Sequence, residues 1–575
     1  MLLSPKQVAK LKIIDIACGS GSFLLGAFQK LIDYHIEWYT QHPKDIQTIN
    51  NVPDTHNDVN GNLRLSSRKK RDILVNNIYG VDIDRRAVEV TQMSLYLKVL
   101  ENENADTLNP QMTLALKEVY LPSLADNIKC GNSLIGTDFG AQGEMFDDGT
   151  RMKINPFDWE MEFKEIMRPS SGSGGGFDCI VGNPPYRMLQ PHNTDDNTLQ
   201  YLRSRFVSAE FKIDLFHLFL QKGISLLKKT GRLSYIVPST LLNNVYAENL
   251  RKWILSECRI LSISVSRGKV FEDADVHTSV IVVEKENAKV KRESNEINIT
   301  SQLDEKFVQQ PHYESTTLQK SFINLPGSVW NILVNEKNFS LIEKLNHFES
   351  LGKVASINRG LITGDRDKFF SNKKKSKDYV PIITGSDVQR YFVNAPSEYV
   401  LFKKPASAGG CWDRDVHFSP HKLVIRQIGT RPTASILLNP IAVTGNIFTI
   451  IARDVDDEIY LLGLINSSPL SYYWKTMFSD FKDSFPQVTI FSLEQLPVRR
   501  IDFQNPSEKK QHNDLLALVE KMLDLHKQIA NSNFDSEKEP IERQIKSTDK
   551  KIDQLVYQLY GLTEEEIKVV EGEAI

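Results

Sequence analysis

The sequence predicts an α/β protein with a doubly wound, mostly parallel sheet, followed by an α+β domain and a helical end. Short apolar runs alternate with segments of helical period through about residue 285, as in parallel sheets. A glycine turn joins the first run to the first helix within residues 11–38. After about residue 290, short β-like runs and basic clusters replace the alternation. Ligands of such sheets bind at the carboxyl ends of the strands, where the strand order reverses.

Length and composition indicate a globular protein of several domains. A chain of 575 residues exceeds the usual size of one domain. The net charge of −3 means that any surface for nucleic acid must be local. The five cysteines form no C-x-x-C pair, so we predict neither disulfides nor a metal site. No apolar run is long enough to span a membrane and no signal peptide opens the chain, which predicts a cytoplasmic protein.

Changes in composition divide the chain into four parts: an α/β domain over 1–300, a connector over 301–344, an α+β domain over 345–507 and a helical segment over 508–575. Only about a dozen residues precede the first strand. A sheet that begins on its central strand usually has a covering segment upstream. We therefore expect that the chain is a fragment, or that it lacks an N-terminal part.

The elements of the α/β domain follow from hydrophobic period and turn residues. In the first hundred residues we expect a strand and glycine turn at 11–21, a helix to about 38, a loop over 43–66, a capped helix at 66–77, a strand at 78–84 and a helix at 85–100. A strand and turn at 128–136 and an irregular stretch at 140–176 should follow. The domain should then continue with a strand from 177, a helix, turn and strand over 216–244, and a last strand at 277–285.

The turn "DIACGSG" follows the first strand and opens a helix. Gly19 and Gly21 allow a tight turn and a close approach of a ligand to free backbone N–H groups. A G-x-G pair alone equally fits a plain strand-to-helix turn. No lysine follows Gly21 as in a phosphate-binding loop. A nucleoside cofactor without a phosphate chain, such as S-adenosylmethionine (SAM), fits this pattern.

Two further strand ends carry groups that suit a nucleoside. Asp82 ends the second strand, where a carboxylate can accept from two ribose hydroxyls, and Ile83 offers an apolar face to adenine. Asp84 fits the role of helix N-cap, which would leave Asp82 free. Asn132 follows the third strand, where an amide can read an adenine edge or serve as a turn residue.

The stretch "FDCIVGNPPYRM" ends a buried strand in a stiff, donor-poor turn. To attack a methyl group, the lone pair of an exocyclic amine must be localised by two fixed acceptors. The side-chain oxygen of Asn183 and the carbonyl of Pro184 can be these acceptors, because two prolines fix their geometry. The ring of Tyr186 can stack on the base. A plain Pro-Pro turn does not explain why an amide and an aromatic ring flank the prolines.

The motifs "DIACGSGSF", "YGVDID", "CGNSL" and "FDCIVGNPPY", in this order, resemble those of amino-group DNA methyltransferases. The resemblance is strongest to the gamma-class, adenine-N6-specific branch, in particular to the methyltransferase and target-recognition parts of type IIG restriction–modification enzymes. It implies a Rossmann-like, SAM-dependent methyltransferase sheet and site-specific methylation of an adenine that leaves the duplex.

The resemblance also implies residue roles. The methionine part of SAM would contact Asp15, Ala17, Gly19, Gly21 and Phe23, its ribose and adenine would contact Asp82, Ile83 and Asn132, and the target adenine would contact Asn183, Pro184, Pro185, Tyr186 and Phe271. Phe271 equally fits a core position.

The C-terminal half resembles the target-recognition domains of these enzymes and of type I specificity subunits, for example in "SINRGLITGDRDKFF" and "LLGLINSSPLSYYW". Double-stranded DNA is therefore the expected partner. Basic residues that could contact phosphates, or simply form a solvated surface, are Lys373, Lys374, Lys375, Arg426 and Arg431.

Other functions stay open. The short N-terminus allows a catalytically idle DNA-binding specificity remnant, and a separate nuclease or N-terminal polypeptide could act in trans. The N-P-P-Y motif also occurs in glutamine methyltransferases, and RNA adenine is another possible acceptor. We predict no DNA cleavage by this chain, because no D…E-x-K constellation stands out. The motifs do not separate restriction–modification from other phage-defence systems.

Overall fold

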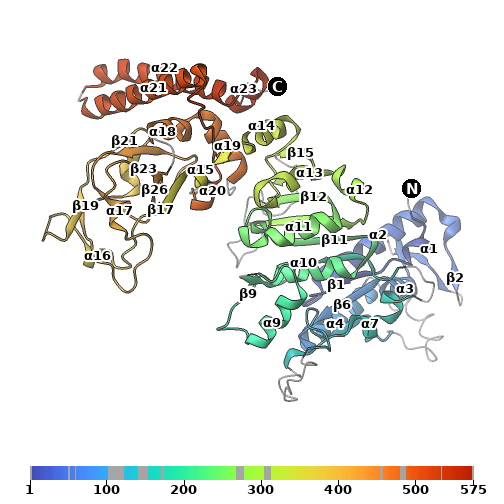
Figure 1. The fold of residues 1–575 in the computed structure, drawn as a ribbon. Helices are drawn as coiled ribbons and strands as arrows, with labels where there is room; N and C mark the ends of the chain where they lie inside the picture. The colour runs from blue at the N-terminus through green and yellow to red at the C-terminus, as the bar shows by residue number, and fades with distance from the viewer. Residues whose placement is uncertain are drawn as a thin grey trace. The chain divides into compact units, whose positions relative to one another are not determined.

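The structure is a computed structural model of the chain. It describes residues 3–49, 52–58, 60–101, 122–139, 153–169, 174–210, 212–266, 277–302, 313–453, 458–478, 487–532 and 534–572. The chain forms two compact units, one up to Ile323 with Gly327–Trp330, and one over Asn324–Pro326 and from Asn331 onward (Figure 1). Their boundary lies inside the predicted connector 301–344.

A large mixed sheet is the centre of the first unit. Its strand order is β15-β14-β12-β13-β11-β8-β1-β6-β7 among the described residues. Strands β7, β6, β1, β8 and β11 pair in parallel, while β13 lies antiparallel between β11 and β12. The strands are β1 Ile13–Asp15, β6 Ile78–Asp82, β7 Ile128–Cys130, β8 Phe177–Gly182, β11 Leu227–Pro238, β12 Cys258–Ser266, β13 Thr278–Lys285, β14 Glu296–Gln302 and β15 Tyr313–Leu318.

The strand order reverses at β1. Ile14 of β1 pairs with Tyr79 of β6 on one side and with Ile180 of β8 on the other. The chain runs outward from β1 through β6 to β7 and then returns to β8. The carboxyl ends of β1 and β8 therefore meet at a topological switch point, where open α/β sheets bind ligands. The predicted α/β class is therefore confirmed, and so is the parallel pairing of the central strands of the sheet.

Helix α2 packs on the sheet through one apolar face. In α2, the buried residues Leu24, Phe28, Ile32 and Tyr39 recur at helical spacing. Burying such a side chain contributes about 1.5–3 kcal/mol. The other principal helices of this unit are α3 Ser67–Asn77, α4 Arg85–Leu100, α9 Asp196–Arg205, α10 Leu215–Leu226 and α11 Glu248–Glu257, and α2 spans Ser22–Gln41 (Figure 1).

Several expectations for this unit are wrong. The strand at 277–285 does not close the sheet, because β14 pairs with β12 and β15 pairs with β14. Strand β14 was missed since only Ile297 and Ile299 are apolar and buried, while polar residues occupy its other face. The expected loop at 43–66 contains two short strand pairs, β2 Thr48–Ile49 with β3 Val52–Pro53 and β4 Thr55–Asn57 with β5 Leu63–Leu65. The expected irregular stretch at 140–176 contains two short helices, α7 Trp159–Glu162 and α8 Lys164–Met167.

Two four-stranded sheets and several helices make up most of the second unit, which is an α+β arrangement with a helical end. One sheet has the order β17-β26-β23-β24 and the other β18-β22-β19-β25. These strands are β17 Ala355–Arg359, β18 Phe370–Ser371, β19 Tyr379–Ile383, β22 Glu398–Leu401, β23 Lys422–Arg426, β24 Ala434–Leu437, β25 Ala442–Val443 and β26 Ile447–Ala452. The principal helices are α14 Glu336–Asn346, α18 Glu458–Asn466, α19 Ser468–Phe478, α21 Pro506–Asn531, α22 Asp535–Leu559 and α23 Glu564–Glu571.

Candidate functional site

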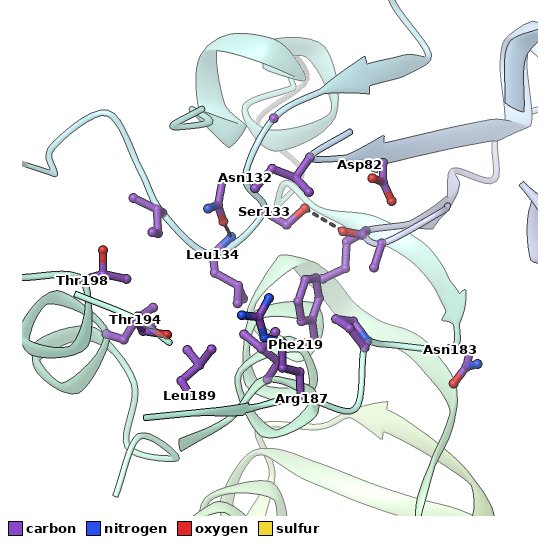
Figure 2. A pocket seen from close by; sticks show the side chains of 18 residues that line it. Asp82, Asn132, Ser133, Leu134, Asn183, Arg187, Leu189, Thr194, Thr198 and Phe219 are labelled. Carbon is purple, nitrogen blue, oxygen red and sulfur yellow. Dashed lines mark hydrogen bonds between the residues drawn. The ribbon is translucent and has the colours of Figure 1, made fainter. Parts of the chain in front are cut away.

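A cavity of about 490 Å³ lies beside the carboxyl ends of β6, β7 and β8 (Figure 2). This volume is in the range of small-molecule sites, and the position beside the switch point is the expected one. The strand ends contribute Ile16, Ala17, Asp82, Ile83, Gly131, Asn132, Ser133, Leu134, Ile135, Asn183 and Pro185; the segment after them and helices α9 and α10 contribute Arg187, Leu189, Thr194, Thr198, Leu202, Leu215 and Phe219.

The glycine turn after β1 requires both of its glycines. Gly19 and Gly21 have φ of 52° and 86°, where side chains are strained. A Cβ on Gly21 would also lie 2.8 Å from Cγ2 of Thr91. The hydroxyl of Thr91 donates to the carbonyl of Gly19 at 2.8 Å. The turn is therefore fixed against α4, although neither glycine lines the cavity.

Asp82 has a structural role that we did not predict. One carboxylate oxygen accepts from the backbone N–H of Gly19 at 2.8 Å and the other from that of Asp84 at 2.9 Å. Asp82 is free of the N-cap role, as predicted, but its carboxylate binds the turn after β1, which lies beside the end of β6. Asp84 is the N-cap of α4, as predicted, and accepts from Arg86 N at 2.8 Å. A carboxylate has about four acceptor sites, so Asp82 can still accept from a ligand in the cavity.

Asn132 serves as a turn residue and also lines the cavity. Its Oδ1 accepts from Leu134 N at 3.1 Å, and its Nδ2 donates to the Ile154 carbonyl at 3.1 Å. Ile83 lines the same cavity and is 51% exposed. An exposed apolar side chain beside polar groups can form one face of a site for a planar ring.

Asp15 is buried and does not line the cavity. It is only 2% exposed, and its Oδ1 accepts from Ala17 N at 2.9 Å. Burial raises the pKa of this carboxyl to about 7, and the negative charge of Asp82 adds to the shift. Of the predicted cofactor residues, Ala17, Asp82, Ile83 and Asn132 line the cavity, while Asp15, Gly19, Gly21 and Phe23 do not.

The N-P-P-Y motif continues directly from β8. Asn183 and Pro185 line the cavity, and Pro184 is buried. The side-chain oxygen of Asn183 is buried and has no hydrogen-bond partner among the residues that the structure describes. A buried acceptor without a partner costs about 1–3 kcal/mol. Such an atom marks a position where a ligand donor would be stabilising.

Tyr186 is fixed by two contacts. Its hydroxyl donates to the carbonyl of Ile236 at 3.1 Å, and its ring packs edge-to-face on Phe216 with the centroids 6.0 Å apart. Burial raises the pKa of the phenol well above its usual value. The ring is therefore held in one orientation. The second predicted aromatic residue, Phe271, lies outside the described residues.

Sequence reasoning missed the wall of the cavity that α9 and α10 form. Leu215 and Phe219 lie one helical turn apart on α10, and Thr198 and Leu202 lie one turn apart on α9. The i, i+4 spacing after the motif was the available signal. It did not distinguish residues that line a cavity from residues of an ordinary core.

The predicted DNA contacts lie on separate elements of the second unit. Lys373, Lys374 and Lys375 are exposed in the turn between β18 and β19. Arg426 ends β23 in the other sheet, and Arg431 is exposed before β24. The structure does not gather these five residues on one strand or helix.

The described residues contain neither a metal-binding cluster nor a membrane-spanning helix. No group of three His, Cys, Asp or Glu residues in the described ranges is placed to hold a metal ion. Likewise, none of the described helices has the length and apolar character needed to cross a membrane.

Two family models match the chain. Residues 76–271 match the Eco57I restriction-modification methylase, and residues 380–498 match the TaqI-like C-terminal specificity domain. The first match includes Asp82 and the N-P-P-Y motif, and the second includes most of the predicted α+β domain. The predicted resemblance to restriction–modification methyltransferases with a specificity domain is confirmed.

Two curated relatives are longer than this chain. It is 33% identical over 285 residues to the type II restriction enzyme and methyltransferase RM.Eco57I of Escherichia coli, covering 49% of this chain and 25% of the relative. It is 24% identical over 630 residues to the putative type II restriction enzyme and methyltransferase RM.MjaORFECS2P of Methanocaldococcus jannaschii, covering 86% and 48%. The chain therefore spans between a quarter and about half of the length of these two relatives.

The fold also matches a solved structure. The Type IIL restriction-modification enzyme MmeI, solved in complex with DNA, superposes with a TM-score of 0.59 at 14% identity, covering 98% of this chain and 72% of MmeI. At this identity the match shows a shared fold.

Proposed function

We propose that this chain is the methyltransferase and target-recognition part of a restriction–modification enzyme. In this proposal it transfers a methyl group from SAM to the N6 amine of a flipped adenine in double-stranded DNA. The observation that carries the proposal is the buried, unpartnered Oδ1 of Asn183, a residue that lines the cavity. The relatives named above support the restriction–modification context.

Asn183 and Pro184 would hold the target amine. The oxygen of Asn183 accepts one amine hydrogen and the carbonyl of Pro184 accepts the other, which localises the nitrogen lone pair toward the methyl donor. The C–N bond forms as the S–C bond breaks, and the sulfur takes the bonding electron pair. The amine then loses one proton to solvent. No strong base is required, because positioning supplies most of the acceleration.

In this proposal the cavity holds the nucleoside part of SAM. Asp82 has acceptor sites left for ribose hydroxyls, and Ile83 offers an exposed apolar face for adenine. Asn132 would approach an adenine edge from the turn after β7. When bound, SAM supplies a methyl group already activated on a sulfonium.

The second unit would contact DNA through its specificity domain, and Lys373, Lys374, Lys375, Arg426 and Arg431 are the candidate phosphate contacts. Base pairs would be read elsewhere on the same unit, because phosphate contacts carry no sequence information. Tyr186, and in the family pattern Phe271, would stack on the adenine once it leaves the duplex.

Two measurements on the full chain test this function. SAM affinity is measured by calorimetry, and transfer of labelled methyl groups from SAM to unmethylated bacterial DNA is measured by filter capture. The wild type should bind SAM and label DNA. Asn183→Ala should keep SAM affinity within about threefold and lose at least about 100-fold in transfer, as expected when a preorganised polar group is removed.

Asn57→Ala is the matched control, since it truncates an exposed asparagine of β4 outside the cavity. This variant should transfer at the wild-type rate. DNA binding without SAM binding would instead support a catalytically idle specificity remnant. Labelling of RNA or of a protein glutamine, but not of DNA, would support the other acceptors.

A further inference from the structure

Arg187 follows the N-P-P-Y motif directly and lines the cavity, where Figure 2 draws its guanidinium among the lining side chains. The residue is exposed. Within the described part of the chain, its side chain forms no hydrogen bond or ion pair. Its backbone is fixed, because its carbonyl accepts from Leu215 N at 3.0 Å at the start of α10. A free cation is therefore held on an ordered segment.

Some exposed arginines of this unit are paired, whereas the side chains of Arg86 and Arg203, like that of Arg187, form no bond within the described residues; Arg187 differs from these two because it lines the cavity. Arg85 pairs with Glu89, and Arg205 pairs with Asp138. Asp82 lines the same cavity as Arg187, but no ion pair joins these two side chains in the described part of the chain. The structure thus leaves this guanidinium ready for an external anion.

The anion must be compatible with a cationic cofactor. A guanidinium beside a sulfonium is unfavourable unless a negative charge accompanies it. The methionine carboxylate of SAM is one candidate, but of the residues proposed for that part only Ala17 lines the cavity, and Gly19 and Gly21 do not. Arg187 and Leu189 both line the cavity, and both belong to the segment that follows the N-P-P-Y motif. Arg187 and Met188 are exposed and follow directly after the motif whose Asn183 would hold the adenine.

We propose that Arg187 binds a backbone phosphate of the DNA strand that carries the flipped adenine. The planar guanidinium can bind such a phosphate through two parallel hydrogen bonds. Arg187 is then a positioning residue: it fixes the nucleotide while Asn183 and Pro184 hold the amine. This inference rests on the proposed function and adds the residue that fixes the target strand.

The salt dependence of DNA binding tests the proposal. The probe is a duplex with the site that the wild type methylates, bound in the presence of the SAM product. Each phosphate contact contributes about 0.9 to the slope of log affinity against log salt. Arg187→Ala should lower this slope by about 1 and weaken binding about tenfold at moderate salt, whereas Arg187→Lys should keep the slope and recover part of the affinity.

Arg203→Ala is the matched control. Arg203 is an exposed arginine on α9 that does not line the cavity, so its removal should leave the slope within about 0.3 of the wild type. In steady-state assays, Arg187→Ala should raise the KM for DNA about tenfold. Its Kd for SAM should stay within about twofold of the wild type.

An unchanged salt slope in Arg187→Ala overturns the proposal. Weakened SAM binding with unchanged DNA binding assigns Arg187 to the methionine carboxylate and also overturns it. If the wild type methylates DNA and the slope is unchanged, only the role of Arg187 fails. If the wild type methylates no DNA, the proposed function fails and the role of Arg187 fails with it.

Discussion

The backbone N–H of Gly19 donates a hydrogen bond of 2.8 Å to the carboxylate of Asp82. This bond ties the glycine turn after β1 to the end of the neighbouring strand β6. The second oxygen of Asp82 accepts from Asp84 N, at the start of α4. One side chain therefore organises two strand ends beside the cavity, in addition to its proposed contact with ribose.

Asp82→Ala should weaken both the cofactor site and the fold. Hydrogen bonds to a charged group contribute about 1.5–3 kcal/mol each, so we expect the free energy of unfolding of the first unit to fall by about 2 kcal/mol. SAM affinity should fall at least about tenfold. Chemical unfolding and calorimetry measure the two effects. Asp82→Asn, which keeps one acceptor oxygen, should show a smaller loss in both, and equal losses would contradict this account.

Gly182→Ala should disturb the junction between β8 and the N-P-P-Y motif. A Cβ at Gly182 would lie 2.7 Å from Oδ1 of buried Asp15. Overpacking of this kind costs about 1–3 kcal/mol, and the shift of β8 should also reduce methyl transfer. Gly26→Ala is the control, because a Cβ at this exposed position of α2 meets no atom within 4 Å. It should stabilise the protein by up to about 1 kcal/mol. Equal unfolding midpoints for the two variants would contradict the prediction.

Asp15 should make stability depend on pH. Burial raises the pKa of its carboxyl in the folded protein to about 7, above the usual value of an unfolded chain. The folded state then holds a proton that the unfolded state releases between about pH 4 and 7. The free energy of unfolding should therefore fall as pH rises through this window and stay lower above pH 7.

Asp15→Asn removes this titration. The free energy of unfolding of Asp15→Asn minus that of the wild type should be higher at pH 8 than at pH 5 by about 1 kcal/mol or more. One pKa unit corresponds to about 1.4 kcal/mol. Urea unfolding at the two pH values measures the difference. Parallel pH profiles of the two proteins would show that Asp15 is ionised in the folded state.

The ring of Tyr186 should matter more than its hydroxyl. Tyr186→Phe loses the hydrogen bond to the Ile236 carbonyl but keeps the packing on Phe216. We expect its kcat to stay within about threefold of the wild type, because the free energy lost is that of one hydrogen bond. Tyr186→Ala also loses base stacking of about 1–3 kcal/mol and should lose about 10–100-fold in kcat/KM for DNA. If the phenylalanine variant lost as much as the alanine variant, the hydroxyl and not the ring would be the important group.

The strand ends could be predicted from the sequence because local chemistry defines them. Gly19 and Gly21 have the positive φ that a G-x-G turn suggests, and Asp84 caps its helix. The Asn183 motif ends a parallel strand of the core. Each of these features depends on a few neighbouring residues.

The remaining features depend on contacts between distant residues. The bond between Gly19 and Asp82 requires the register of β1 on β6, and no local pattern contains that register. The cavity wall of Leu202 and Phe219 requires α9 and α10 to face the strand ends. Strand β14 was missed for another reason: its two buried isoleucines lie among polar residues, so the apolar signal is weak.

The identity of the methylated nucleoside tests the central claim most directly. Wild-type protein and Asn183→Ala are each incubated with methyl-labelled SAM and unmethylated DNA, and the digested nucleosides are separated. Our account predicts that the wild type places the label in N6-methyl-2′-deoxyadenosine and that Asn183→Ala, with SAM bound, leaves the DNA unlabelled. Label in a cytosine product, or the same labelling by both proteins, would contradict the role of Asn183 as the acceptor that holds an adenine amine.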